Sequence, residues 1–320
     1  MANPKGAMKH SIRNRIIKFF LIIIGVSLLS FLLIAFSGKD PAEIIARRGD
    51  ANATPEMIEQ VRIEMGLDGN FFERYINWTK GFFTGDFGSS IATYHPISKD
   101  IAQFFPVTLT MVGLALLWTA LLSVPIALLC AKYKNGIFDH ITRGVTIFGI
   151  CIPTFWLGYM GLVIFALRMK WCTVVPTGKF SDYILPSAVL AVPVICGVVR
   201  MLRATLLTEL ASDYVRYAKA RGLSAKRILV RHVLRNAMPP IITVFCQYFG
   251  SLIASSAVME GVFSINGIGS YMIQSVIAAD SVATATCVVI VAVVFISANT
   301  LGDIINRLIC PWIVRESNGN

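Results

Sequence analysis

Cysteine and histidine are the side chains of this chain best suited to metal binding or nucleophilic chemistry. Zinc sites usually draw on closely spaced pairs of these residues. The four histidines stand far apart, none within four residues of another histidine or a cysteine: His10, His95, His140 and His232. The seven cysteines are equally scattered, and all but Cys172 lie in or beside long apolar runs. This distribution favours small core residues over a metal site or a disulfide framework.

Nucleotide hydrolysis and acyl transfer also require recognisable arrangements, and the sequence shows neither. It contains no Gly-x-x-x-x-Gly-Lys-Ser/Thr phosphate loop with which to cradle ATP. The long apolar runs hold no His, Asp or Glu from which a nucleophile, a base and an orienting group could be assembled. We therefore expect no catalytic residue, no bound cofactor and no metal ligand in this chain.

The most informative pattern lies in segment 200–238, where apolar and basic residues alternate at helical spacing. Five residues before Gly222 fall on one helical face: Leu206, Leu207, Leu210, Tyr214 and Ala218. Gly222 suits the left-handed turn that ends a helix, and Ser224 can cap the next one. We predict a rigid helix, turn and helix. Such an element fits a groove on a soluble partner or lies on anionic lipid, and the pattern leaves both open.

The elements that position this segment are long apolar runs. The chain has 320 residues and is only 15% charged, against roughly 25% in soluble domains. A bilayer core about 30 Å thick needs roughly 20 residues of helix. Six stretches contain no Lys, Arg, Asp or Glu: 19–38, 101–131, 144–167, 183–199, 236–259 and 281–302. We predict an all-α membrane protein with about six transmembrane helices, and we interpret a weaker run, 261–279, as a partly inserted helix or loop on the outer side.

Basic residues predict which side of the membrane each segment faces. The two ends of the chain, with segments 132–143 and 200–235, hold 19 basic against five acidic residues, whereas the other segments hold ten against thirteen. This distribution follows the positive-inside rule, so both ends are predicted to be cytoplasmic. The basic balance reflects topology and contact with membrane lipid, and it gives no support for nucleic-acid binding. The predicted organisation has four parts: 1–38 (N-terminus and first span), 39–100 (outer segment), 101–310 (core spans, with 200–238) and 311–320 (cytoplasmic tail).

The outer segment 39–100 is predicted to form a small folded cap. Its clearest helix has a cap, a proline at the first position, apolar residues at helical spacing and a stop: Thr54, Pro55, Met57, Ile58, Val61, Met65 and Gly66. Further along, Gly81, Gly85 and Gly88 around Asp86 predict turns.

A pathway through the membrane should be lined by helix faces that can shift. Three prolines interrupt predicted spans and free backbone carbonyls: Pro125, Pro153 and Pro193. A stripe at helical spacing in the fifth span is polar and can face a lumen or serve helix packing: Gln247, Ser251, Ser255 and Ser256. Glu260, at the outer end of that span, is either a solvated carboxylate or a contact to a partner. The candidate pathway or gate residues are Pro153, Gln247, Ser251, Ser255 and Glu260.

Four groups of residues, in this order, carry a resemblance that spans nearly the whole chain. They are Gly85-Asp86-Phe87-Gly88-Ser89-Ser90; Ile152-Pro153-Thr154-Phe155-Trp156; Tyr214 through Ser224 with Arg231-His232, Leu234-Arg235-Asn236-Ala237 and Pro239; and Glu260 through Val262-Phe263 to Gly267-Ile268-Gly269. Together they resemble the permeases of binding-protein-dependent ABC importers, specifically the peptide/nickel family. The resemblance implies a type I ABC importer permease fold, and it marks Gly85, Asp86, Gly88 and Ser90 as an outer-segment motif.

In that family the segment matching 200–238 is a coupling element that docks into a cleft of the ATPase subunit. The resemblance therefore implies an ATPase-coupling site: Glu209, Asp213, Tyr214, Arg216, Ala218, Lys219, Ala220, Arg221, Gly222, Leu223 and Ser224. Ala218 and Gly222 match the motif's alanine and glycine, but Arg216 stands where the general motif has a glutamate. Whether Glu209 or Asp213 replaces that glutamate is open.

The resemblance also implies the partners and the location. They are a second homologous permease, two subunits that bind ATP and Mg, and an external substrate-binding protein, at the bacterial inner membrane. The substrate is nickel, a metal chelate or a di- or oligopeptide, and the stretch from Thr54 to Asp68 resembles the nickel branch slightly more. One rival is a secondary transporter or channel, which usually carries ionisable residues at mid-membrane, and the six runs have none. Another is a membrane scaffold protein, which has no ATPase partner.

Overall fold

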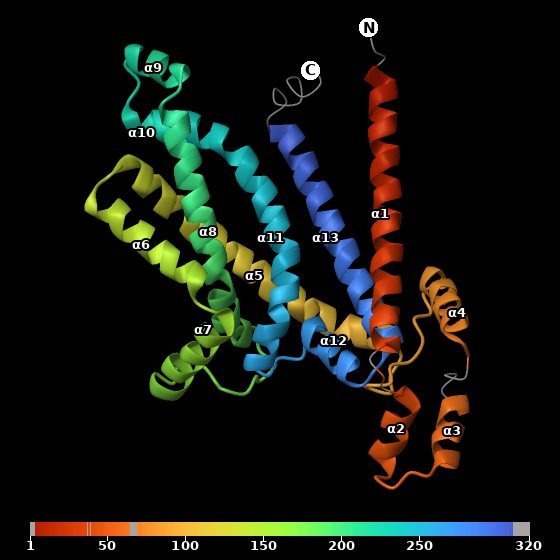
Figure 1. The fold of residues 1–320 in the computed structure, drawn as a ribbon. Coiled ribbons are helices and arrows are strands. Elements are labelled where there is room, and N and C mark those ends of the chain that lie inside the picture. Colours follow the sequence, from red (N-terminus) through yellow and green to blue (C-terminus); the bar gives the residue numbers. More distant parts are fainter. Residues whose placement is uncertain (1–3, 37, 39, 65–68, 310–320) are drawn as a thin grey trace. The chain divides into compact units, whose positions relative to one another are not determined.

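Helices make up nearly all of the protein in a computed structural model, which describes residues 4–36, 38, 40–64 and 69–309 (Figure 1). In these residues the one strand-like feature is an isolated bridge between Ser89 and Pro96. The chain divides into two compact units, Met1–Val107 with Asn266–Ile296 (unit 1), and Thr108–Ile265 with Ser297–Asn320 (unit 2).

Each unit has its own set of helices. Unit 1 contains α1 (Pro4–Ala35), α2 (Pro41–Gly49), α3 (Pro55–Glu64), α4 (Phe71–Thr84) and α12 (Ile268–Ile277). Unit 2 contains α6 (Ile137–Cys151), α7 (Thr154–Gly161), the π-helix η1 (Leu162–Arg168), the 3-10 helix η2 (Phe180–Tyr183), α8 (Ile184–Leu210), α9 (Asp213–Ala220), α10 (Ala225–Arg227), the π-helix η3 (Ile228–Val233) and α11 (Leu234–Val262). Two helices begin in unit 1 and end in unit 2: α5 (Ile97–Lys132) and α13 (Ser281–Ile309).

Four helical stretches of the described chain are long and apolar enough to cross a membrane: Ile97–Lys132, Phe180–Leu210, Ala225–Val262 and Ser281–Ile305. They contain the second, fourth, fifth and sixth predicted spans. The first predicted span lies in α1, whose apolar stretch Phe19–Leu33 is shorter. The count of six spans therefore stays a prediction.

The third predicted span, 144–167, is not one straight helix. Helix α6 and the helical segment Thr154–Arg168 meet at 100° across a short break. Pro153 lies at this break, as the residue before α7, where its missing N–H ends the hydrogen-bond ladder. The other two prolines predicted to interrupt spans leave their helices continuous, because α5 runs through Pro125 and α8 through Pro193.

The weakest apolar run, 261–279, folds as the end of α11, a turn and the short helix α12. Ten residues of α-helix rise about 15 Å, half the thickness of a bilayer core. Helix α12 is therefore too short to span by itself, and its partial insertion on the outer side stays a prediction.

Aromatic rings join α1 and α4 inside unit 1. The ring of Phe31 lies with its centroid 5.3 Å from those of both Tyr75 and Trp78. The indole Nε1 of Trp78 donates a hydrogen bond to Thr286 Oγ1 at 2.9 Å, so its polar edge is satisfied in a buried site. Helix α4, although part of the predicted outer segment, is fixed by these contacts to the first and last apolar helices.

The predicted cap contains the short helices α2 and α3. Thr54 precedes α3, and its Oγ1 accepts the N–H of Met57 at 3.4 Å, which confirms the predicted start of this helix. Ile58 and Val61 pack on a small core, as their spacing predicted. The predicted end of the helix, Met65 and Gly66, lies outside the described residues.

One carboxylate fixes the motif of residues 85–90. Asp280 Oδ2 accepts hydrogen bonds from Ser90 Oγ at 2.8 Å and from the Ile91 N–H at 2.6 Å. Its Oδ1 accepts the N–H of Ala283 at 2.9 Å, so the same side chain caps α13. Both Ser90 and Asp280 are fully buried. Asp280 therefore holds a turn of the outer segment and the start of an apolar helix in one geometry.

The predicted turns of this region are correct at two of three glycines. Gly85 ends α4 with φ of 82°, and Gly88 has φ of 75°. Gly81, by contrast, lies inside α4, so its assignment to a turn is wrong. Asp86 is exposed, and its side chain accepts the N–H of Gly88 at 3.0 Å.

Replacing Asp280 by alanine should lower the stability of unit 1 by about 3 kcal/mol, because buried N–H groups lose their acceptor and each costs about 1–3 kcal/mol when left unpaired. The measurement is the midpoint of thermal unfolding of the detergent-solubilised protein. Asp86→Ala is the matched control, since this exposed carboxylate accepts one hydrogen bond and its loss should cost about 1 kcal/mol or less. Equal shifts for the two variants would contradict this account of Asp280.

Candidate functional site

Within segment 200–238, residues 211–233 form a helical protrusion between α8 and α11, and α9 is drawn above both helices in Figure 1. Helix α8 ends at Leu210, two residues follow, and α9 begins at Asp213. The apolar face predicted to run from Leu206 to Ala218 therefore belongs to two helices, and its description as one face is wrong. Leu206 is buried in α8, whereas Val215 is the fully buried residue of α9.

The turn after α9 has the predicted form. Gly222 adopts φ of 75°, which L-residues other than glycine avoid at a cost of about 1–2 kcal/mol. The N–H groups of Gly222 and Leu223 donate to the carbonyls of Lys219 and Ala218, at 2.9 and 3.2 Å. These bonds satisfy the free carbonyls at the end of α9. Ser224 lies at the cap position of α10, but its side chain makes no capping hydrogen bond, so its predicted role as a cap is wrong.

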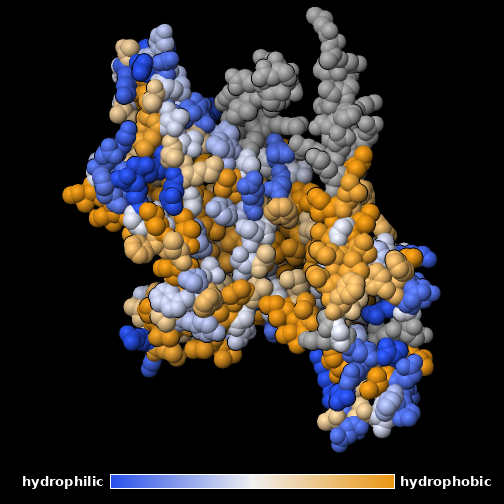
Figure 2. Space-filling view, in the orientation of Figure 1, coloured by the Kyte–Doolittle hydropathy of each residue, from blue (hydrophilic) through white to orange (hydrophobic). Residues whose placement is uncertain are grey.

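One face of α9 is free for a partner. Val215 is buried, and Tyr214, Ala218 and Leu223 are half-buried against the rest of unit 2. The remaining candidate residues of α9 and its turn are exposed: Asp213, Arg216, Lys219, Ala220, Arg221 and Gly222. Tyr217, which is not among the predicted coupling residues, is 74% exposed. Figure 2 shows hydrophilic side chains gathered over α9 and α10.

The two carboxylates near the turn have different partners. Glu209 Oε2 accepts a hydrogen bond from the hydroxyl of Tyr214 at 2.8 Å, which joins the end of α8 to the start of α9. Burial raises the pKa of the Tyr214 phenol, and the hydrogen bond to Glu209 adds to this rise. Asp213 instead pairs with Arg216 at 3.3 Å, and both side chains are largely exposed. An exposed carboxylate therefore lies beside Arg216, which occupies the glutamate position of the coupling motif.

A buried ion pair at the base of the protrusion was missed by sequence reasoning. The Nη2 and Nε atoms of Arg203 donate to the two carboxylate oxygens of Asp139, at 2.6 and 2.5 Å. Asp139 has no exposed surface, and the N–H of Asn135 donates to it at 3.0 Å. The pair joins α6 to α8, about two turns before α8 ends. Its one sequence signal is that Asp139 is the single acidic residue of the basic segment 132–143.

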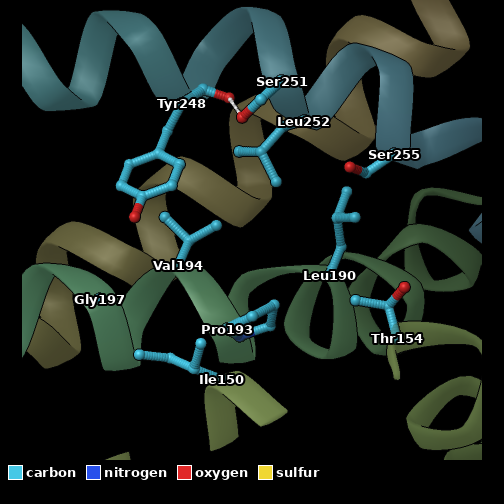
Figure 3. Close-up of a pocket in the computed structure, with 10 residues that line it drawn as sticks. All are labelled: Ile150, Thr154, Leu190, Pro193, Val194, Gly197, Tyr248, Ser251, Leu252 and Ser255. Carbon is cyan, nitrogen blue, oxygen red and sulfur yellow. Dashed lines mark hydrogen bonds between the residues drawn. The ribbon is translucent and has the colours of Figure 1, made fainter. Parts of the chain in front are cut away.

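A cavity of about 270 Å³ lies between α8 and α11, with Ile150 of α6 and Thr154 of α7 in its wall (Figure 3). Two of the predicted pathway residues, Ser251 and Ser255, line it, and Pro193 lies opposite them. The hydroxyl of Ser251 donates to the carbonyl of Tyr248 at 3.1 Å. Within the described residues the lining contains no charged side chain and no cysteine, histidine or methionine.

The other predicted pathway residues are not part of the wall of this cavity. Gln247 is exposed on α11 and is absent from the cavity wall. Pro153 precedes Thr154 of the wall in sequence but does not itself line the cavity. Glu260 is fully buried, so its interpretation as a solvated boundary carboxylate is wrong. Its Oε1 accepts hydrogen bonds from Thr108 at 2.6 Å and from Ser256 at 3.0 Å. Glu260 thus joins α11 to α5 within unit 2.

The apolar helices, the protruding α9 and the neutral cavity define a subunit of a membrane transport system. Residues 123–315 match the family described as the binding-protein-dependent transport system inner membrane component, and residues 8–112 match the N-terminal part of such membrane components. The chain belongs to this family, and it is the permease of an ABC importer.

Two relatives match nearly the whole chain. The glutathione transport system permease protein GsiC of Escherichia coli (strain K12) is 31% identical over 288 residues, which cover 90% of this chain and 93% of the relative. A protein of Brucella abortus (strain 2308), named as a peptide transport system permease, is 29% identical over 310 residues, which cover 94% and 98%. Among solved structures, the MetNI methionine ABC transporter in inward-facing conformations gives a TM-score of 0.55 at 18% identity, covering 63% of this chain and 92% of that one. This similarity confirms the predicted ABC importer permease fold.

Replacing Val215 by aspartate should detach α9, because a charge buried without a partner is strongly unfavourable. Trypsin cleavage after Lys219 and Arg221 in the detergent-solubilised protein should then accelerate about tenfold or more, which corresponds to about 1.4 kcal/mol of easier local opening. Tyr217→Asp is the matched control, because this neighbouring side chain is exposed and its change should leave the cleavage rate unaltered. If both variants were cleaved at the wild-type rate, Val215 would not anchor α9.

Proposed function

We propose that this permease imports short peptides that an external substrate-binding protein delivers. The observation that carries this proposal is the cavity between α8 and α11, whose wall consists of apolar side chains and hydroxyl groups. Such a wall suits the neutral amide backbone and varied side chains of peptides. Metal ions prefer carboxylate, imidazole or sulfur ligands, and the cavity offers none of these among its described residues.

The names of the relatives support the same substrate class. One is named for glutathione, which is a tripeptide, and the other for peptides in general. The sequence also predicted nickel or a metal chelate as a substrate. The names of these relatives do not support that class, and it stays a prediction. Selectivity in this proposal comes mainly from the external binding protein, so the permease needs only a wall that tolerates peptides.

We further propose that α9 transmits ATP hydrolysis from partner subunits. The complex contains this chain, a second homologous permease, two ATPases that hold ATP and Mg, and the binding protein, with both ends of this chain in the cytoplasm. Support comes from the exposed face of α9, where Tyr217 and the basic side chains Lys219 and Arg221 can enter a partner cleft. This chain supplies no ATP site or catalytic group of its own.

The exposed pair of Asp213 and Arg216 suggests how this chain replaces the glutamate of the coupling motif. Glu209, near the end of α8, is held by the hydrogen bond from Tyr214, so it is the weaker candidate. Asp213 is exposed and lies one turn before Arg216, so its carboxylate can reach the same partner surface. The secondary-transporter alternative gives no role to an exposed helix of this kind, and family membership favours the ABC importer.

Tyr217→Ala should lower ATP-dependent uptake and co-purification of the ATPase subunits about thirtyfold, since an exposed tyrosine at the centre of an interface contributes about 2 kcal/mol. Tyr133→Ala is the matched control, because this tyrosine is also exposed in a predicted cytoplasmic segment but lies outside the protrusion. Lys219 should also react with an amine reagent only from the cytoplasmic side. Labelling of Lys219 from outside, or unchanged ATPase binding in Tyr217→Ala, would contradict the proposed coupling.

The substrate can be tested with the complete importer in proteoliposomes. We expect a labelled dipeptide and glutathione to accumulate only when ATP and the binding protein are both present, and nickel ions alone not to accumulate. Uptake of nickel without peptide uptake would replace peptide by metal in the proposal. Uptake that persists without ATP would instead favour a secondary transporter or channel.

A further inference from the structure

Departures from regular helix structure gather around the cavity between α8 and α11. The break between α6 and α7 at Pro153 places Thr154 in the cavity wall. Pro193, inside α8, also lines the cavity, and it leaves the carbonyl of residue 189 without its helical hydrogen bond. One turn later, Gly197 presents bare backbone to the same space. This wall can deform more easily than a regular helix pair.

Gly197 makes room for a single side chain, that of Tyr248. A Cβ atom at residue 197 would lie 2.6 Å from the Tyr248 hydroxyl oxygen, closer than side chains tolerate. The phenol therefore occupies its present position only because residue 197 is glycine. Figure 3 shows the ring extending from α11 towards Gly197 on α8. The ring thus closes one end of the cavity by a contact between two helices.

The Tyr248 hydroxyl accordingly faces the cavity end without a fixed role in the fold. In the described part of the chain, no hydrogen bond of this hydroxyl to another group of the protein is found, and the group is not sealed from solvent. At the opposite end, Figure 3 shows the hydroxyls of Ser255 and Thr154 beside the space. Neutral hydroxyls at both ends can donate to and accept from the N–H and C=O groups of a peptide backbone, whereas metal ions prefer carboxylate, imidazole or sulfur ligands.

We propose that Tyr248, seated over Gly197, is the size-limiting residue of the peptide passage. Its ring sets how large a peptide passes, and its hydroxyl exchanges hydrogen bonds with the peptide backbone. This inference rests on the proposed function, because it assigns a passage role to the cavity. The class of ligand is peptides of two or three residues. The ring must swing away from Gly197 for passage, and Pro193 gives α8 the freedom to allow this.

The test is the ratio of tripeptide to dipeptide uptake by the complete importer in proteoliposomes. The ratio is measured within one preparation, so it does not depend on how much complex folds. Tyr248→Ala removes the ring and should raise the ratio. Gly197→Ala pushes the ring into the cavity and should lower it. The double variant should resemble Tyr248→Ala, because the added methyl group then has no ring to displace.

Tyr248→Phe tests the hydroxyl alone. It should keep the ratio but slow dipeptide uptake about fivefold, the factor that a neutral hydrogen bond of about 1 kcal/mol represents.

Gly113→Ala is the matched control. Gly113 lies inside α5, and a Cβ atom there meets nothing within 4 Å, so the same chemical change should leave the ratio unaltered. The inference is overturned if Tyr248→Ala and Gly197→Ala give the wild-type ratio while the wild-type importer transports peptides. If the wild-type importer takes up no peptide, the proposed function itself fails, and the two failures are thereby separated.

Discussion

The absence of water in a bilayer core is the constraint on which the rest of this structure depends. Backbone N–H and C=O groups there must pair within the chain, so long continuous helices are the default and each departure needs a compensating reason. The described helices depart from regularity at Pro153, at the π-helices η1 and η3, and between α8 and α9. The first of these departures borders the cavity, and η3 and the α8–α9 break border the protruding helix. All of these departures except η1 thus adjoin the cavity or the helix α9, to which transport and coupling are assigned.

The features that the sequence predicted correctly depend on neighbouring residues in the chain. Hydropathy located the long helices α5, α8, α11 and α13, because length and composition alone decide whether a segment can span. The Gly222 turn and the start of α3 at Pro55 were predicted correctly from residue type, since each reflects the conformational preference of one or two residues. The break at Ala211 and Ser212 was missed because the apolar spacing of the sequence continues across it.

Contacts between distant residues were beyond the reach of the sequence. Arg203 and Asp139 are 64 positions apart, and Thr108 and Glu260 are 152 apart, so no spacing rule connects them. Glu260 was misread for this reason, since a carboxylate at the end of an apolar run is indistinguishable in sequence from a solvated one. The same limit applied to Gly197, whose role depends on a tyrosine from another helix. A lone acid in a basic segment was the available signal for Asp139.

The ion pair of Asp139 and Arg203 explains how a movement of α9 can reach the cavity. Breaking such a buried pair by moving one partner alone leaves an uncompensated charge, which costs about 3–5 kcal/mol, so α6 and α8 move together at this level. Tyr214 and Glu209 join α9 to the end of α8. In the proposed coupling, a displacement of α9 therefore passes to α8 and, through Arg203, to α6. Because α6 ends at the Pro153 break and α8 contains Pro193 and Gly197, the displacement is absorbed at the cavity wall, where the ring of Tyr248 rests.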